Sequence, residues 1–162
     1  MKNRLGRRLT LAFLVLSIGF FSCEQDNEYL EGLKQQEIDD REAYIEDNNI
    51  TTEPTASGLY YIETKEGSGV QAVAGDVVKV HYEGQSLTGI VFDSSWDRGA
   101  PFEFTLGTGS VIKGWDEAIA LMKEGGTAQL IVPSDLAYGE AGNSGIPPYS
   151  TLVFYVELID VL

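Results

Sequence analysis

The stretch SVIKGWDEAIALMKE, Ser110–Glu124, decides the fold. Ser110 is a residue type that caps helix starts, and Gly125 is one that ends helices. Four apolar residues inside the stretch recur at spacings of three and four, which places them on one helical face: Ile112, Trp115, Ile119 and Met122. We therefore predict one short amphipathic helix whose apolar face packs on another layer.

Outward from this helix, turn residues alternate with β-prone runs. The predicted turns are Gly67-Ser68-Gly69, Ala74–Asp76, Glu83-Gly84, Thr88-Gly89, Arg98-Gly99 and Gly125-Gly126. The predicted strands are Leu59–Glu63, Val77–Tyr82, Phe102–Leu106, Ala128–Val132 and Thr151–Val161. About five strands joined by hairpins around a single helix predict an α+β fold, in which an antiparallel sheet covers that helix.

The composition fits one folded domain with an acidic surface. The chain has 162 residues, of which 43% are apolar and 22% are charged, so it can fill a core. Its formal charge of −14 argues against a nucleic-acid partner, because phosphate binding needs clustered Lys and Arg. A single Cys and a single His offer no cluster of metal ligands, so we expect neither a metal nor a cofactor.

Residues 1–22 are typical of a secretory leader. Four basic residues precede the apolar run Leu9–Phe21, whose 13 residues fall short of the ~20 that a transmembrane helix needs. The run ends at Ser22-Cys23, which resembles a bacterial lipoprotein signal in which Cys23 takes a diacylglycerol. This pattern predicts a lipid anchor to a membrane of the cell envelope, on the periplasmic or outer-membrane face. An ordinary cleaved signal with a chance Cys is the alternative.

Residues 23–57 form an acidic connector. Residues 24–53 contain eleven acids and two bases, and Asn48-Asn49 would end a helix before Pro54. Five apolar residues follow helical spacing only in part: Leu30, Leu33, Ile38, Tyr44 and Ile45. We predict a solvated helix that spaces the body from the membrane, in a protein that is a monomer. A dimerisation helix is the alternative.

The sequence of the body, residues 58–162, does not match the motifs that are typical of covalent catalysis. His81 lies in an alternating strand, where a packed or surface role is expected rather than a general base. Gly107-Thr108-Gly109 precedes the helix but lacks the Gly-Lys-Ser/Thr of a phosphate loop. The body is instead dense in aromatic residues near turns, which predicts either a core or a concave apolar binding site.

Four strings stand out in the body. They are Val80–Gly84 (VHYEG), Phe92–Ser95 (FDSS), Val111–Glu117 (VIKGWDE), and Ala137–Gly139 (AYG) followed by Ile146–Pro148 and Thr151–Phe154. In this order and spacing they resemble the FKBP family of peptidyl-prolyl cis-trans isomerases, over essentially the whole body. The leader and the connector add a resemblance to membrane-anchored lipoprotein members, including those linked to gliding motility.

The resemblance implies a twisted antiparallel sheet wrapped over one short helix, with a proline pocket between them. Trp115 would form the pocket floor, the Ile112 N–H and the Tyr138 hydroxyl would bind peptide carbonyls, and Arg98 would pair with Asp93 or orient its loop. The implied catalytic residues are Tyr82, Phe92, Asp93, Tyr138 and Phe154. The implied substrate-binding residues are Arg98, Phe102, Val111, Ile112, Trp115 and Ile146.

The implied activity is rotation of X-Pro bonds in extracytoplasmic proteins, which would assist their folding. The expected partners are proline-containing polypeptides, with macrolides as inhibitors. The alternative is a non-catalytic module or chaperone that uses the same pocket to hold proline-containing chains.

Overall fold

The computed structural model describes residues 19–162, and in its first helix the side chains from residue 27 onward. Most of the predicted leader and the side chain of Cys23 lie outside what is described. The helices are α1 (Gly19–Asp47), α2 (Ser95–Arg98) and α3 (Lys113–Ile119), with 3-10 turns η1 (Ser134–Leu136) and η2 (Gly139–Ala141). The strands are β1 (Tyr60–Lys65), β2 (Val77–Ser86), β3 (Val91–Ser94), β4 (Phe102–Thr105), β5 (Thr127–Val132) and β6 (Leu152–Val161).

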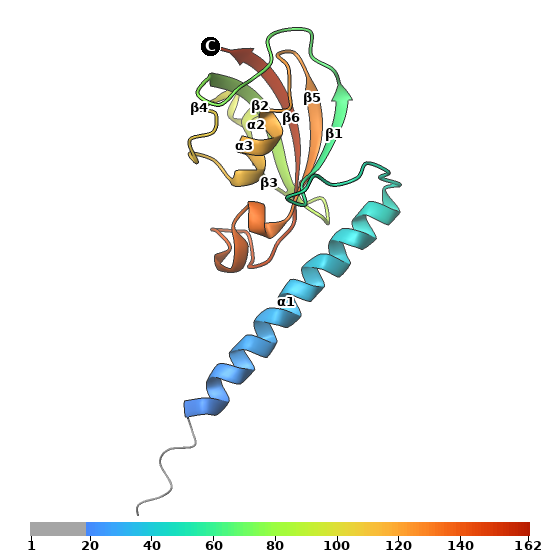
Figure 1. Ribbon diagram of the computed structural model, residues 1–162, viewed down its shortest axis with the longest axis vertical. Coiled ribbons are helices and arrows are strands. Elements are labelled where there is room, and N and C mark those ends of the chain that lie inside the picture. The colour runs from blue at the N-terminus through green and yellow to red at the C-terminus, as the bar shows by residue number, and fades with distance from the viewer. Residues whose placement is uncertain (1–18) are drawn as a thin grey trace, which may run out of the picture.

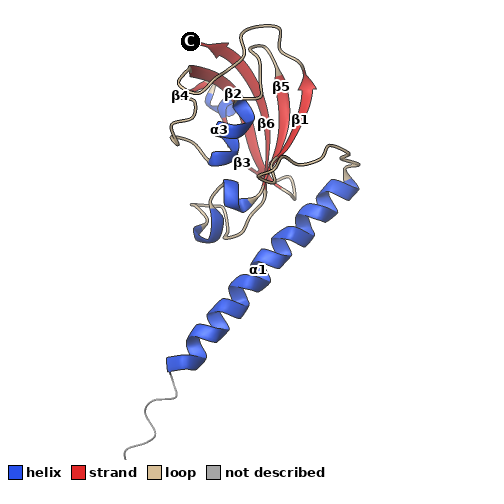
Figure 2. Ribbon diagram, in the orientation of Figure 1, coloured by secondary structure: helices blue, strands red, loops and turns tan. Residues whose placement is uncertain are grey.

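The strands form one six-stranded antiparallel sheet, as Figure 2 shows in red. Its order is β1-β5-β6-β2-β3, and β4 pairs with β2 beside this path. The ten-residue strand β2 is therefore the hub, bonded to β3, β4 and β6. All five predicted strands are present, while β3 and the single turn of α2 were not predicted. The predicted fold class is confirmed, and Figure 1 shows α3 lying across one face of the sheet.

Alternating side chains of the sheet build the core against α3. In β6, the four residues predicted to share a face are all buried: Leu152, Phe154, Val156 and Leu158. Helix α3 contributes Trp115, Ala118 and Ile119, each at most 4% exposed. Gly114 permits the close approach, because a Cβ there would lie 2.5 Å from Val132 Cγ1 of β5.

Helix α3 is shorter than the predicted Ser110–Glu124. It begins at Lys113 with Ile112 as its N-cap, and the hydroxyl of Ser110 does not cap it. The preceding loop is held out of the helix by Asp116, whose carboxylate accepts bonds from the N–H groups of Gly107 and Gly109 at 2.8 and 3.0 Å.

The helix also ends before the predicted stop at Gly125. Beyond Ile119 the chain tightens into turns, and the Gln71 amide donates to the carbonyls of Ala120 and Met122, each at 2.8 Å. Met122 remains buried, so the apolar spacing was correct although the helix is not continuous.

Helix α1 ends at Asp47, just before the predicted stop at Asn48-Asn49. Figure 1 shows it passing the lower end of the sheet, with its N-terminal half extending away from the body. Within the residues that the structure covers, no helix combines the length and apolar character needed to cross a membrane.

One face of α1 lies against the body. Six residues of this face are at least partly buried and follow helical spacing: Leu30, Leu33, Glu37, Arg41, Tyr44 and Ile45. The Tyr44 hydroxyl accepts a bond of 3.2 Å from the side-chain amide of Gln129 in β5. The prediction of a solvated helix is therefore wrong for this face of α1. The apolar stripe of this helix is incomplete in the sequence because Glu37 and Arg41 occupy positions on the buried face where apolar residues are expected.

Candidate functional site

Five aromatic rings, from four strands and one helix of the body, meet between the sheet and α3. Trp115 is at their centre and is 4% exposed, with its ring centroid 4.8 Å from that of Tyr82 and 5.4 Å from that of Phe154. The ring pairs among these five residues are edge-to-face or tilted, the arrangement that aromatic quadrupoles favour. We call these rings the aromatic cluster: Tyr82, Phe92, Phe102, Trp115 and Phe154.

The pleat of β2 aims Tyr82 into this cluster. Alternate residues of β2 are buried, so Val78 and Val80 fill the core and Tyr82 continues the same face into the cluster. Gly84 is next on that face, and it makes room for two rings. A Cβ there would lie 2.7 Å from Phe154 and 2.8 Å from Phe92. The predicted turn at Glu83-Gly84 is therefore wrong, because this glycine is needed for ring packing inside a strand.

A polar network joins the cluster at Tyr82. The Tyr82 hydroxyl donates to one carboxylate oxygen of Asp93 and accepts a bond of 2.8 Å from Arg98, which also pairs with the other Asp93 oxygen. The guanidinium lies 5.3 Å from the centroid of the Tyr82 ring. Arg98 pairs with Asp93 as the sequence predicted. Burial, together with the bond to Asp93, raises the pKa of Tyr82 above its usual 10, so the hydroxyl stays protonated at neutral pH.

The single turn of α2 holds Arg98 within reach of Asp93 and Tyr82. Ser94 caps the turn by accepting the N–H of Asp97 at 3.2 Å, and Gly99 ends it at a positive φ of 70°. The fully buried Ser95 accepts the Tyr82 N–H at 2.7 Å, which fastens α2 to β2. His81 contacts the same hydroxyl at 2.9 Å and stacks on Trp96, so it is a packed residue, as predicted.

A backbone donor is free at the start of α3. Ile112 is the N-cap residue with extended geometry, and its carbonyl accepts the Trp115 N–H at 2.9 Å. Among the described residues, the Ile112 N–H has no partner. Val111 and Ile112 are partly buried and pack against the core, which brings this N–H beside Trp115.

Residues 134–151, here called the site segment, carry Tyr138 and Ile146. Both side chains pack on the core cluster, and Ile146 is 8% exposed. A tight turn fixes Ile146, through bonds of 2.8 and 2.9 Å between its backbone and that of Asn143. In the described part of the chain, the Tyr138 hydroxyl has no hydrogen-bond partner, which leaves it free to donate.

Both ends of the site segment are tied to α1 by Glu37. This carboxylate is 7% exposed and accepts the N–H and the hydroxyl of Ser134, each at 2.6 Å, and the hydroxyl of Thr151 at 2.8 Å. Arg41 lies 3.7 Å from the same carboxylate and donates to Thr151 at 3.4 Å. We call these four residues the Glu37 seam.

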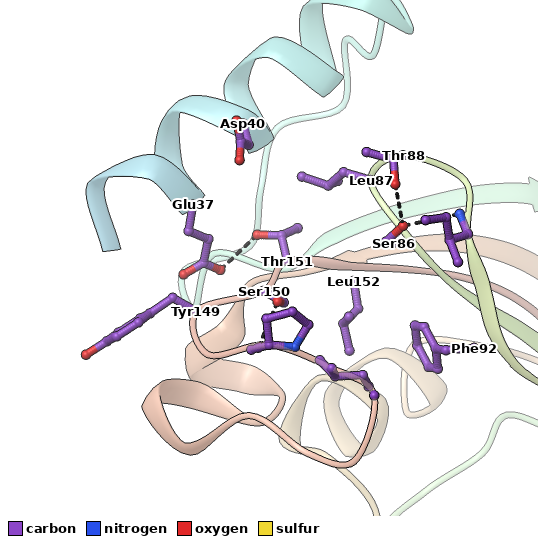
Figure 3. Close-up of a pocket in the computed structure, with 14 residues that line it drawn as sticks. Glu37, Asp40, Ser86, Leu87, Thr88, Phe92, Tyr149, Ser150, Thr151 and Leu152 are labelled. Atoms are coloured by element: carbon purple, nitrogen blue, oxygen red, sulfur yellow. Dashed lines mark hydrogen bonds between the residues drawn. The ribbon is translucent and has the colours of Figure 1, made fainter. Parts of the chain in front are cut away.

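A cavity of about 400 Å³ lies between α1 and the body. Its walls come from α1, the turn at 86–90 and residues 145–152, and Figure 3 shows Glu37 and Asp40 on the α1 side with Phe92 across from them. Of the aromatic cluster, only Phe92 lines this cavity, so the two sites are neighbours that share Phe92 and Ile146.

The structure thus brings the predicted residues to one region. Four of the five predicted catalytic residues make direct ring or polar contacts with one another, and Tyr138 packs on the same core. Sequence reasoning missed Gly84, Ser95, Asp116 and Glu37. Asp116 had a readable signal as an acid in the first turn of a helix. Glu37 had none, because its partners lie 97 and 114 residues away. Ser95 lay within the string Phe92–Ser95, but its bond to β2 could not be predicted from that string.

Comparison with known proteins identifies relatives of this arrangement. Residues 69–159 match the family model described as FKBP-type peptidyl-prolyl cis-trans isomerase. The FK506-binding protein of Neisseria meningitidis serogroup B is 50% identical over 105 residues, which are 64% of this chain and 96% of that protein.

A longer relative extends the likeness beyond the body. The isomerase FkpA of Escherichia coli is 44% identical over 121 residues, 75% of this chain but only 43% of that protein. The crystal structure of FkpA superposes with a TM-score of 0.69 at 35% identity, covering 90% of this chain and 70% of that chain. This coverage is greater than residues 58–162 alone provide.

Proposed function

We propose that this chain, which belongs to the FKBP-type peptidyl-prolyl cis-trans isomerase family and is such an isomerase, acts on extracytoplasmic proteins. It rotates their X-Pro bonds within the aromatic cluster. The observation that carries this proposal is the setting of Trp115. It is surrounded by aromatic side chains, and the free Ile112 N–H and Tyr138 hydroxyl belong to residues that pack against the same core.

The reaction needs no bond to be made or broken. Amide resonance opposes rotation with a barrier of ~18–20 kcal/mol, and X-Pro isomers exchange over tens of seconds or longer. The twisted amide has lost its resonance and is less polar than the planar one. An apolar cluster therefore favours the twisted form, which is differential binding of the transition state.

Each side chain has a proposed role in this scheme. Trp115 supports the proline ring, while Tyr82, Phe92, Phe102 and Phe154 surround it with apolar surface. The Ile112 N–H and the Tyr138 hydroxyl bind carbonyls on the two sides of the proline, and Val111 and Ile146 contact the flanking chain. Asp93 sits beside the carbonyl of the twisting bond, held in place by Tyr82 and Arg98.

A refolding assay tests the proposed role in folding. The chain should accelerate the slow, proline-limited phase of a refolding protein that contains a native cis proline. Addition of a macrolide of the FK506 class should abolish the acceleration, by occupying the aromatic cluster. Unchanged slow-phase kinetics at a protein concentration that accelerates a short peptide would overturn the folding role.

We further propose that the protein is tethered in the cell envelope through a lipid on Cys23. The apolar run that ends at Ser22-Cys23 supports this, and two or three acyl chains hold firmly to a bilayer. The connector would then space the body from the membrane. Intact mass spectrometry of the mature protein should show a diacylglycerol-modified Cys23, and Cys23→Ala should lose it. An unmodified Cys23 in the mature wild type would contradict the tether.

A further inference from the structure

The cavity between α1 and the body is placed to contact a bound substrate. Phe92 contacts Phe154 of the aromatic cluster at 5.8 Å between centroids, and it also lines the cavity, as does Ile146. A polypeptide whose proline lies on Trp115 therefore reaches the cavity within a few residues. Two to four extended residues span about 7–14 Å.

The walls of the cavity are mainly apolar. Leu87 and Ile90 line it from the turn at 86–90, and Pro147 and Leu152 line it from residues 145–152. Ile90 is 70% exposed, so its aliphatic surface is available to a bound chain. The volume of about 400 Å³ falls within the range of sites that bind small groups.

The polar groups at the α1 wall are negative. The described lining includes two carboxylates, those of Glu37 and Asp40, and no Lys or Arg. Glu37 is already used by the seam, while Asp40 is exposed and, among the described residues, accepts only a 2.8 Å bond from Gln36 of its own helix. Asp40 therefore leaves a negative charge at the mouth of an apolar cavity.

We propose that this cavity, the α1 groove, is a subsite for the substrate chain next to its proline and that it seats a lysine or arginine side chain. The aliphatic stem lies along Leu87 and Pro147, and the cationic head reaches Asp40, as long cationic side chains do at the edge of apolar surfaces. The proposal rests on the isomerase function. It makes α1 part of substrate selection rather than a spacer alone.

The test measures isomerisation of matched peptides by the full chain. Each peptide contains one X-Pro bond and carries either Lys or Gln at a position two, three or four residues before or after the proline. We expect at least one position at which Lys raises kcat/KM about two- to fivefold over Gln, the range of a single solvent-accessible charge pair. The gain should lie mainly in KM and should decrease with added salt.

The chain supplies a matched control for Asp40. Asp39 is its neighbour on α1, is also exposed and accepts the same 2.8 Å bond from the Gln four residues earlier, but it does not line the groove. Asp40→Asn should reduce the Lys-over-Gln ratio to near one, and Asp39→Asn should leave that ratio unchanged.

Two results would overturn the subsite. One is the absence of any Lys preference while the peptides are isomerised, and the other is an equal preference in wild type and Asp40→Asn. A chain that accelerates no peptide at all would overturn the isomerase function itself, and the subsite with it. These results are distinguishable because the Gln peptides report the isomerase activity by itself.

Discussion

Trp115 at the centre of the aromatic cluster and Glu37 at the centre of the seam are both buried, yet opposite kinds of interaction hold the two regions together. The cluster is an assembly of rings around Trp115, stabilised by apolar contact. The seam is one carboxylate that satisfies three donors on the body and pairs with Arg41. The cluster depends on close packing of its rings, whereas the seam depends on every polar partner being in place.

The two regions meet through the site segment, residues 134–151. Its ends are fixed by Ser134 and Thr151 at the seam, and its middle carries Tyr138 and Ile146 to the aromatic side. The polar contact thus positions part of the apolar site. The catalytic groups and the contacts that hold them in place come from different parts of the chain, so substitutions should affect turnover and stability separately.

The largest expected effect is the loss of a cluster wall. Phe154→Ala removes a ring that is 4% exposed and contacts Trp115, Tyr82 and Phe92. It should lower the free energy of unfolding by about 3–5 kcal/mol and nearly abolish isomerisation. Urea unfolding and a peptide assay measure the two effects. Wild-type stability in this variant would show that the cluster is not part of the core.

Removal of the seam carboxylate should come next. Glu37→Ala leaves Ser134 and Thr151 without their acceptor and Arg41 without its counter-charge, which should destabilise the protein by about 3 kcal/mol. Amide hydrogen exchange should increase at Ser134 while the β2 amides stay protected. Glu31→Ala, an exposed acid on the same helix, is the control. Equal stability of the two variants would show that α1 does not support the body.

A smaller effect is expected for a hydroxyl that acts only on substrate. Tyr138→Phe keeps the packed ring and removes a donor worth ~0.5–1.5 kcal/mol. We expect kcat/KM to fall roughly 2- to 13-fold with no change in unfolding. A parallel loss of stability would place the hydroxyl in the structural seam rather than in the site.

The smallest expected effect is that of pH on turnover. Tyr82 remains protonated because its pKa is raised, and His81 has no role in the proposed reaction, so kcat/KM should be flat between about pH 6 and 9. A bell-shaped profile that disappears in His81→Gln would contradict this assignment.

Stability should respond to pH in alkali. Burial, with a contribution from Glu63, raises the pKa of Tyr61 to about 12. The neutral phenol is favoured in the folded state, so its contribution is complete below the unfolded pKa of ~10 and is lost as the pH rises through the folded value. Unfolding free energy should therefore decrease between about pH 10 and 12, and less so in Tyr61→Phe.

The contrast between the regions also explains what the sequence could predict. The cluster was predictable because apolar periodicity places Trp115 and Phe154 on faces that must be buried, and the family strings cover the same residues. The exact limits of α3 were not, since Asp116 and Gln71 set them through contacts with loops. Glu37 was invisible because a buried carboxylate follows no hydrophobic pattern, and its partners are 97 and 114 residues away.

The central claim is that the site binds the twisted amide better than the planar one, and Asp93→Leu tests it most directly. In one NMR experiment on a short X-Pro peptide, shift changes at Trp115 report binding and cis-trans exchange reports turnover. The account predicts exchange slowed about tenfold or more, with an almost unchanged Kd. Equal losses of exchange and binding, or wild-type exchange in this variant, would contradict it.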